Sequence, residues 1–303
     1  AHAAYFAGFD QRLDPNNVEP GERVDDRLWR IETDYSNFRA ALIHLAAVGD
    51  AISLLRLSGA MALFWHHRGH LDEGRRWLEE ALSGTPDLPS RDRARALAGL
   101  SLVIWSQGDT ETSIELAQTC RAMAEALGDD ELTTLSIHLH GIGELIGGDQ
   151  LRARQLMEDA RDRWQALGVR SSTAMALSVL GALAHGAGDF ERAAQRADEA
   201  YRLFQEVGHP SGISRTLVLL AQLARSQGDD RSAALAYQKA LEGWADVDAR
   251  WSSVREPIDQ SRSIHFPRWA SFDDRWTIVC ALTGLARFAA EHGQSDLAAM
   301  LLG

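Results

Sequence analysis

The stretch His66-His67-Arg68-Gly69-His70 contains the residue types best suited to chemistry in this chain of 303 residues. Two imidazoles four residues apart can share one face of a helix and bind a metal ion. Here, however, Gly69 is expected to end the helix between His66 and His70. No glutamate follows His66 as it would in an HExxH zinc motif. We therefore expect no metal at this position.

Adjacent carboxylates occur at several places, and none of them predicts acid–base catalysis. They are Glu79-Glu80, Asp129-Asp130-Glu131 and Asp273-Asp274. Each group falls at an expected helix end, where carboxylates complement the helix dipole and stay solvated. No serine in a glycine-flanked elbow, and no other nucleophile with a nearby base, is recognisable. The sequence thus predicts a protein with no enzymatic activity and no cofactor.

Composition narrows the choice of compartment and partner. The net charge of −12 argues against a nucleic-acid surface, which needs clustered Lys and Arg. There is no run of eighteen apolar residues to span a membrane, and no signal peptide. Cys120 and Cys280 fall at helical packing positions, so we expect a reducing, cytoplasmic environment. Because the chain starts at Ala1 without methionine and ends at Gly303 in mid-pattern, we expect a piece of a longer protein.

Glycines at a nearly constant spacing form the strongest pattern in the sequence. Steps of 39, 40, 40 and 40 residues separate Gly69, Gly108, Gly148, Gly188 and Gly228. A fixed period in this range is the mark of a helical solenoid. Each glycine can end a first helix with a positive φ, and an aspartate after it can cap a second helix. These aspartates are Asp109, Asp149, Asp189 and Asp229.

Small side chains recur at fixed offsets from these glycines. Five residues after them come Gly74, Ser113, Ala153, Ala193 and Ala233. Twelve residues after them come Ala81, Cys120, Ala160, Ala200 and Ala240. Seven residues before them come Ala62, Ser101, Gly141, Gly181 and Ala221. Antiparallel helices approach closely only where neither has a bulky side chain at the crossing, so the pattern predicts tightly packed helix pairs.

These spacings resemble the tetratricopeptide repeat, whose small residues have the same offsets from its turn glycine. The resemblance covers about residues 58–248, although the period is near 40 rather than 34. A second marker with the same step is formed by Leu127-Gly128, Leu167-Gly168 and Val207-Gly208. This marker places the extra residues in the helices rather than in the loops. The resemblance implies an all-α fold, a right-handed superhelical α-solenoid of antiparallel helix pairs.

The chain is expected to have four regions. Residues 1–50 form a helical lead-in that includes one long helix from Asp25 to about Val48, because apolar residues recur there at three- and four-residue steps. Residues 51–248 form the repeats, 249–273 an aromatic-rich irregular insertion, and 274–303 a final truncated helix pair. The insertion either covers the open end of the array or forms a lid over a ligand groove.

A more specific series of residues resembles large bacterial transcriptional regulators. The series comprises Ile31–Leu42, Phe64–Gly69, Glu73–Leu82 and Leu282–Gly293. It is similar to the C-terminal half of LuxR-type and SARP-type activators with a STAND ATPase core. In that family a helical repeat array follows a nucleotide switch and acts as sensor and oligomerisation arm. This chain contains neither a phosphate loop nor a recognisable helix-turn-helix, so the resemblance implies a non-catalytic sensor region.

In tetratricopeptide stacks the first helix of each pair lines the concave face. Transferring its exposed offsets gives the candidate binding residues His66, Trp105, His138, His185, Arg215, Gln222 and Arg225. Such side chains could hold a protein or peptide, an acidic peptide among them, or a planar or anionic small-molecule effector. One alternative is that they are ordinary solvated or packing residues. Another is that the array is a scaffold, which forms oligomers or packs on an ATPase module without a ligand.

Overall fold

The computed structural model describes residues 24–252 and 272–294, and all regular secondary structure in these residues is helical. The chain divides into two compact units, unit 1 (residues 1–176) and unit 2 (residues 177–303). The described ranges contain no strand, which confirms the expected all-α class of tetratricopeptide-like repeats.

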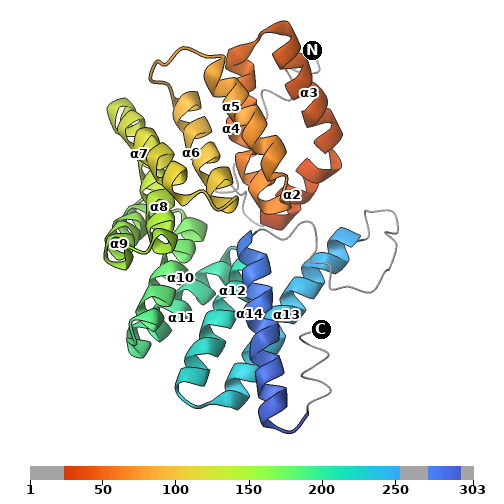
Figure 1. The fold of residues 1–303 in the computed structure, drawn as a ribbon, viewed down its shortest axis with the longest axis vertical. Coiled ribbons are helices and arrows are strands. Elements are labelled where there is room, and N and C mark those ends of the chain that lie inside the picture. The colour runs from red at the N-terminus through yellow and green to blue at the C-terminus, as the bar shows by residue number, and fades with distance from the viewer. Residues whose placement is uncertain (1–23, 253–271, 295–303) are drawn as a thin grey trace. The chain divides into compact units, whose positions relative to one another are not determined.

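The helices are connected by short turns, except across residues 253–271 (Figure 1). In chain order they are α2 (Val24–Thr33), α3 (Tyr35–Val48), α4 (Ala51–Arg68), α5 (Leu71–Ser83), α6 (Arg91–Ser106), α7 (Thr110–Leu127), α8 (Asp130–Gly147), α9 (Gln150–Ala166), α10 (Arg170–Gly186), α11 (Phe190–Glu206), α12 (Pro210–Ser226), α13 (Asp230–Ser252) and α14 (Phe272–Glu291). The boundary between the two units falls within α10.

Consecutive helices form antiparallel pairs within each unit (Figure 1). In unit 1 the first helices α4, α6 and α8 pair with the second helices α5, α7 and α9. In unit 2 the first helices α10 and α12 pair with α11 and α13, and α14 takes the place of the next first helix. First helices also contact one another in sequence, α4 with α6, α6 with α8, and α12 with α14.

Glycines in the left-handed region end the helices where the sequence predicts. The φ angle is 71° at Gly69, 91° at Gly108, 97° at Gly148, 79° at Gly188 and 78° at Gly228. After the second helices it is 67° at Gly128, 73° at Gly168 and 62° at Gly208. Both glycine markers therefore close helices, as expected.

The aspartates after the turn glycines cap the second helices. Each Oδ1 accepts a hydrogen bond from the backbone N–H three residues later, at 3.2 Å for Asp109, 2.9 Å for Asp149, 3.1 Å for Asp189 and 3.0 Å for Asp229. Asp129 caps α8 in the same way at 3.0 Å. Asp129 belongs to the acidic group Asp129-Asp130-Glu131. Its carboxylate thus satisfies a free N–H at a helix start, as expected for a structural carboxylate.

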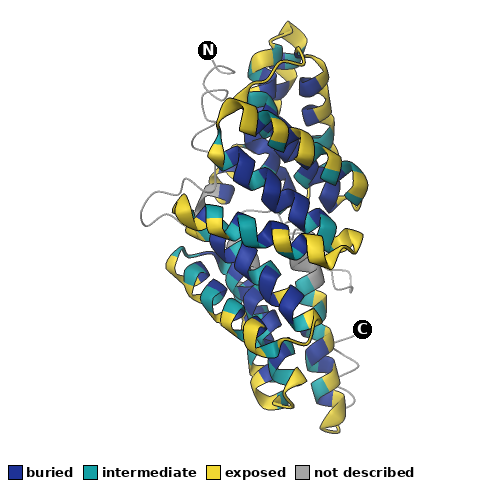
Figure 2. Ribbon diagram, turned by 90° about the vertical axis from the view of Figure 1, so that its left-hand side faces the viewer, coloured by how far each residue is buried: buried dark blue, intermediate teal, exposed yellow. Residues whose placement is uncertain are grey.

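The small residues at the three repeat offsets are all buried. Ser101 and Ser113 show how close the paired helices come, because each hydroxyl donates to the backbone carbonyl of the other residue at 2.9 Å. Figure 2 shows buried positions running along the middle of the helices, with exposed turns at their ends. The small side chains therefore mark helix–helix contacts, as predicted.

The lead-in differs from the single helix expected over residues 25–48. α2 ends at Thr33, and Asp34 stands between α2 and α3 with φ −98° and ψ 9°. The Thr33 hydroxyl donates to the carbonyl of Trp29 at 3.0 Å. Thr and Asp weaken a helix because they make such local hydrogen bonds. The apolar periodicity continues across this break, so it could not reveal it.

Part of the range expected to be an irregular insertion, residues 249–273, is helical at both ends. α13 continues to Ser252 and α14 already begins at Phe272. No glycine or proline stands between the predicted end of the repeats and Pro257, so nothing in the sequence stops α13 earlier. The remainder of the insertion lies outside the described residues. So does the second helix expected near the end of 274–303.

Both cysteines are free thiols. Cys120 is buried in α7, where its thiol lies 3.1 Å from the carbonyl oxygen of Ala94. Burial raises the pKa of the Cys120 thiol to about 12, so this cysteine packs and does not react. Among the described helices none is long and apolar enough to cross a membrane.

Candidate binding surface on the first helices

The candidate residues all lie on first helices. His66 is on α4, Trp105 on α6, His138 on α8, His185 on α10, and Arg215, Gln222 and Arg225 on α12. Unit 1 buries its candidates, whereas unit 2 leaves its candidates half-buried. The two units therefore differ in what their first helices offer to a partner.

The exposure expected for His66, Trp105 and His138 is wrong, because these residues are only 7%, 7% and 6% exposed. For His66 and Trp105 the reason is contact between successive first helices. His66 Nδ1 lies 2.7 Å from the hydroxyl of Ser106, and the rings of His66 and Trp105 have centroids 6.1 Å apart. A side chain three residues before a turn glycine thus meets the next first helix. Binding by these three residues stays a prediction.

His185 repeats in unit 2 the contact that His66 makes in unit 1. Its Nε2 lies 3.0 Å from the hydroxyl of Ser226. The hydroxyls of Ser106 and Ser226 each donate their one hydrogen to a backbone carbonyl four residues earlier, at 2.9 and 3.0 Å. The imidazole must therefore donate to the serine. A nucleophilic serine needs the opposite arrangement, so these pairs are structural.

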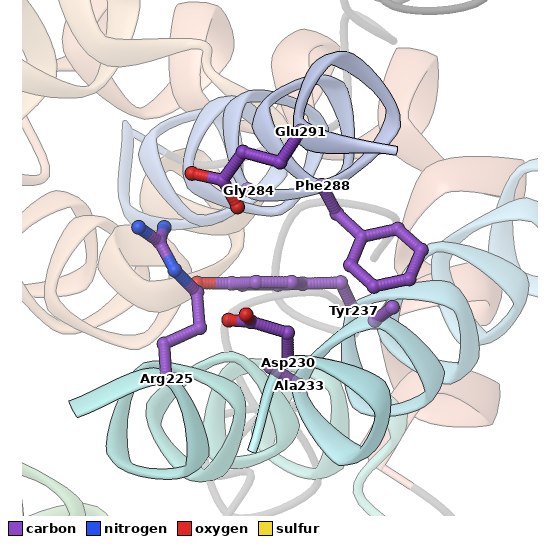
Figure 3. A pocket seen from close by; sticks show the side chains of 8 residues that line it. Arg225, Asp230, Ala233, Tyr237, Gly284, Phe288 and Glu291 are labelled. Atoms are coloured by element: carbon purple, nitrogen blue, oxygen red, sulfur yellow. The ribbon is translucent and has the colours of Figure 1, made fainter. Parts of the chain in front are cut away.

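Arg225 has the same position on α12 and extends toward α14 (Figure 3). Its guanidinium donates to the hydroxyl of Tyr237 and attracts the carboxylate of Glu291, which stands two residues before the next turn glycine. Together with Asp230 and Phe288, these side chains line a small, shallow hollow. Arg225 therefore links α12 and α13 to α14, as the histidines link earlier first helices.

A partly open surface remains on α10 and α12, and we call it the first-helix face of unit 2. It consists of Ser178, Ala182, His185, Arg215, Gln222 and Arg225. Ala182 is exposed and the other members are half-buried. The hydroxyl of Ser178 lies 3.4 Å from that of Thr216, so the two helices are adjacent along this face. Four of the residues predicted from sequence come together here.

Sequence reasoning missed the partners of these side chains, which are Ser106, Ser226 and Glu291. Each of the three stands two residues before a turn glycine. Each interacts with a side chain of the previous repeat that stands three residues before the turn glycine of that repeat. The repeat period contains the signal for these contacts, because the positions two and three residues before each turn glycine were both assigned to the first helices. What it lacks is the direction of each side chain relative to the next repeat.

The His66–His70 stretch is divided between two contacts. The ring of His70 stacks on Tyr35 with centroids 4.8 Å apart and an interplanar angle of 23°. His66 instead contacts Ser106. In the described part of the chain no group of three or more His, Cys, Asp or Glu side chains is arranged to hold a metal ion.

His138 gives unit 1 a pH-dependent stability. Burial lowers the pKa of His138 to about 4, and its Nδ1 has no hydrogen-bond partner. Because the folded-state pKa lies below the usual value of 6.5, this stability is present above pH 6.5 and is lost as the pH falls toward 4.

A His138→Met variant is expected to be less sensitive to acid than the unaltered chain. When the pH is lowered from 6.5 to 5, its free energy of unfolding should fall by about 2 kcal/mol less. Urea unfolding at both pH values measures the difference, and equal losses would contradict it.

The repeat geometry has counterparts among known proteins. Residues 172–246 match the tetratricopeptide repeat family. The matched segment contains every residue of the first-helix face of unit 2. None of the curated proteins matches the sequence of this chain at a significant level.

Solved structures show the same fold at low sequence identity. BtubC from P. vanneervenii is 17% identical with a TM-score of 0.54, over 79% of this chain and 98% of BtubC. A Rap protein complexed with Competence and Sporulation Factor is 13% identical with a TM-score of 0.59, over 92% of this chain and 73% of Rap. A STAND protein with a tetratricopeptide repeat sensor, from Pyrococcus horikoshii, is 13% identical with a TM-score of 0.59. That match covers 90% of this chain but 40% of the STAND protein. The chain therefore has tetratricopeptide-like helical repeats.

Proposed function

We propose that this chain is the non-catalytic binding arm of a bacterial transcriptional regulator, and that it binds a protein segment through the first-helix face of unit 2. Tetratricopeptide-like repeats generally mediate protein binding or scaffolding. The structural likeness to a STAND protein with a repeat sensor, and to a Rap protein complexed with a factor, supports this role. The resemblance of the sequence to LuxR-type and SARP-type regulators supports the regulatory part of the proposal.

The observation on which the proposal depends is the open polar face on α10 and α12. The Nε2 of His185 donates to Ser226, so its Nδ1 is left as an acceptor. Gln222 offers a donor and an acceptor. An extended segment presents N–H and C=O groups along its length, so these side chains match what such a segment needs.

The shape of the face also favours a segment over a compact small molecule. The face lies along two adjacent helices, and Ala182 is its exposed member on α10, between Ser178 and His185 in the sequence. Small ligands bind mostly in enclosed cavities, which bury most of their surface. An extended chain instead needs a long, shallow contact, and the small side chain of Ala182 leaves room for one.

Selection from a random-peptide display library against the full chain tests this function. We expect the chain to enrich peptides, and an Ala182→Trp variant to bind them about tenfold more weakly, because the ring would fill the face. Leu235→Trp is the matched control, since Leu235 is 52% exposed on the second helix α13. Failure to enrich any peptide, or an equal loss in both variants, would rule the proposal out.

A scaffold role is the second candidate, and exposed apolar side chains in unit 1 favour it. Ile43 and Val48 on α3 and Ile52 on α4 are 56%, 59% and 54% exposed. Apolar side chains of this size often mark contacts between proteins when they are close together. Light scattering across a concentration series distinguishes the two roles, because a scaffold forms a concentration-dependent dimer whose first-helix face binds nothing.

A further inference from the structure

Four exposed apolar residues of unit 1 occupy the same position in successive repeats. Val48 ends α3, Leu88 follows α5, Leu127 ends α7 and Leu167 follows α9. Steps of 40, 39 and 40 residues separate them, and they are 59%, 68%, 41% and 41% exposed. Single exposed leucines are common on protein surfaces, but here the exposed residue recurs with the period of the repeat. We call these four residues the apolar edge of unit 1.

Helix termination does not explain these apolar side chains. Gly49, Gly128 and Gly168 follow three of them and end the helices through the backbone, with φ angles of 72°, 67° and 73°. The apolar residue that packs back on the helix in such caps stands after the glycine, not before it. Because an exposed side chain removes little apolar area from water, the edge adds little to the stability of the chain itself.

Contacts between successive turns place the apolar edge along one side of unit 1. Nε of Arg91, in the turn after α5, donates to Oδ2 of Asp129, in the turn after α7, at 2.8 Å. A Cβ at Gly84, where the turn after α5 begins, would lie 3.7 Å from the Cβ of Ala51, which follows α3. The end of α9 lies beside the start of α8, because these helices form an antiparallel pair. The four residues therefore follow this side of the unit in chain order.

Backbone N–H groups at this side of unit 1 already have acceptors. The side chains of Asp50, Ser90 and Asp129 each accept from the N–H three residues later, at 3.1, 3.2 and 3.0 Å. An extended segment laid along the edge would bury its own C=O groups without these donors as partners. A helix pairs its backbone internally and needs only apolar side chains opposite the edge. The edge therefore suits a helix better than an extended segment.

The spacing of the apolar edge also matches a helix. First helices of successive repeats contact one another, α4 with α6 and α6 with α8. Helices in contact lie about 8–10 Å apart, so the residues of the edge recur at about this distance. Seven residues of an α-helix rise about 10 Å. One apolar side chain in every seven of a partner helix can therefore meet one residue of the edge in each repeat.

The charges beside the apolar edge favour a basic partner over the first three turns. The exposed charged residues of the four turns are Asp50, Asp87, Arg91, Asp130 and Arg170. Arg91 already pairs with Asp129 at 2.8 Å. The side chain of Asp87 remains 87% exposed although it pairs with Arg93 at 3.0 Å. Since Arg170 stands in the fourth turn only, a partner with Lys or Arg beside its apolar stripe gains most along the first three.

We propose that the apolar edge of unit 1 binds an amphipathic helix of another protein, with apolar side chains seven residues apart and basic side chains flanking them. The edge and the first-helix face of unit 2 share no residue. This inference therefore goes beyond the proposed function and does not depend on it.

Selection of helical peptides against the full chain tests the inference. The displayed library has an alanine-rich helical scaffold with one face randomised. We expect Leu, Ile or Val at seven-residue spacing beside Lys or Arg in the enriched peptides. An enriched peptide should bind Leu88→Ser and Leu127→Ser each about tenfold more weakly. Leu235→Ser is the matched control, because Leu235 is 52% exposed on α13 and the substitution is the same. Circular dichroism verifies that each variant is folded.

Several outcomes would overturn the inference. They are no enrichment of helical peptides, enrichment without seven-residue spacing or with acidic flanks, and an equal loss in Leu235→Ser. A dimer of the chain that Leu88→Ser dissociates in light scattering would show that a second copy covers the edge, which also overturns it. Ala182→Trp should leave binding of the helical peptide unchanged. A loss in that variant would place the peptide on the first-helix face and support the proposed function instead.

Discussion

Replacing Trp164 with alanine is expected to lower the free energy of unfolding of unit 1 by about 3–5 kcal/mol. Trp164 is 1% exposed and packs with Ile137 on α8 and with Leu156 and Ala160 on its own helix, α9. Removing the indole leaves a cavity, because these neighbours are held in rigid helices and cannot close it. Urea unfolding followed by circular dichroism measures the loss, and hydrogen exchange of α8 and α9 locates it.

A phenylalanine at the same position is the matched control. The indole Nε1 of Trp164 is buried and has no hydrogen-bond partner in the structure. Phenylalanine removes this unsatisfied donor and retains most of the ring volume, so we expect a change within about 1.5 kcal/mol. If Trp164→Ala and Trp164→Phe lowered the free energy of unfolding equally, packing of the aromatic ring would not be what stabilises the contact between α8 and α9.

The second large effect is expected for Gly74→Ala in α5. A Cβ at Gly74 would lie 2.9 Å from three side-chain atoms of Trp65. Trp65 is 0% exposed, and its Nε1 donates to the hydroxyl of Tyr35 at 3.1 Å. The ring cannot move aside without breaking this bond, so we expect a loss of about 1–3 kcal/mol.

Gly147→Ala provides the control for close approach. At Gly147 a new Cβ would meet only Thr110 Cγ2, at 3.8 Å, which is an ordinary contact. Alanine also favours helix over glycine by up to about 1 kcal/mol, so this variant should be neutral or slightly more stable. Thermal denaturation of both variants compares their melting temperatures. Similar values would contradict the prediction, because they would show that α4 and α5 can accommodate a Cβ at position 74.

The fold could be predicted because each repeat has the same types of residue at the helix end, the helix start and the helix–helix contact. Gly188 ends a helix with a φ of 79°, Asp189 caps the next one, and Ala193 packs against the pair. Each of these roles depends on the residue type and its immediate neighbours. Agreement at a fixed period then separates the pattern from chance.

The break at Asp34 could not be predicted, because it depends on competition between local hydrogen bonds. The apolar residues on either side keep helical spacing, so periodicity alone favours one continuous helix. The Thr33 hydroxyl bonds to the carbonyl of Trp29, and the chain leaves the helix one residue later. Such a balance is not visible in residue types alone.

The main error of the sequence prediction is the exposure expected for the candidate residues of unit 1, which are buried. Offsets from one turn glycine place His66 and Trp105 on a first helix, but they do not show what the next repeat brings against it. In the structure Ser106, forty residues from His66, covers that position. The residues of unit 2 stay more open, and Arg215 and Gln222 are half-buried.

Site-specific photo-cross-linking tests the central claim most directly. A benzoylphenylalanine replaces Ala182 on the first-helix face of unit 2, or Leu235 on the second helix α13, and an enriched peptide is added before irradiation. We expect the peptide to be cross-linked from position 182 and not from position 235. Cross-linking from position 235 alone, or with equal yield from both positions, would contradict the claim that the first helices form the recognition surface.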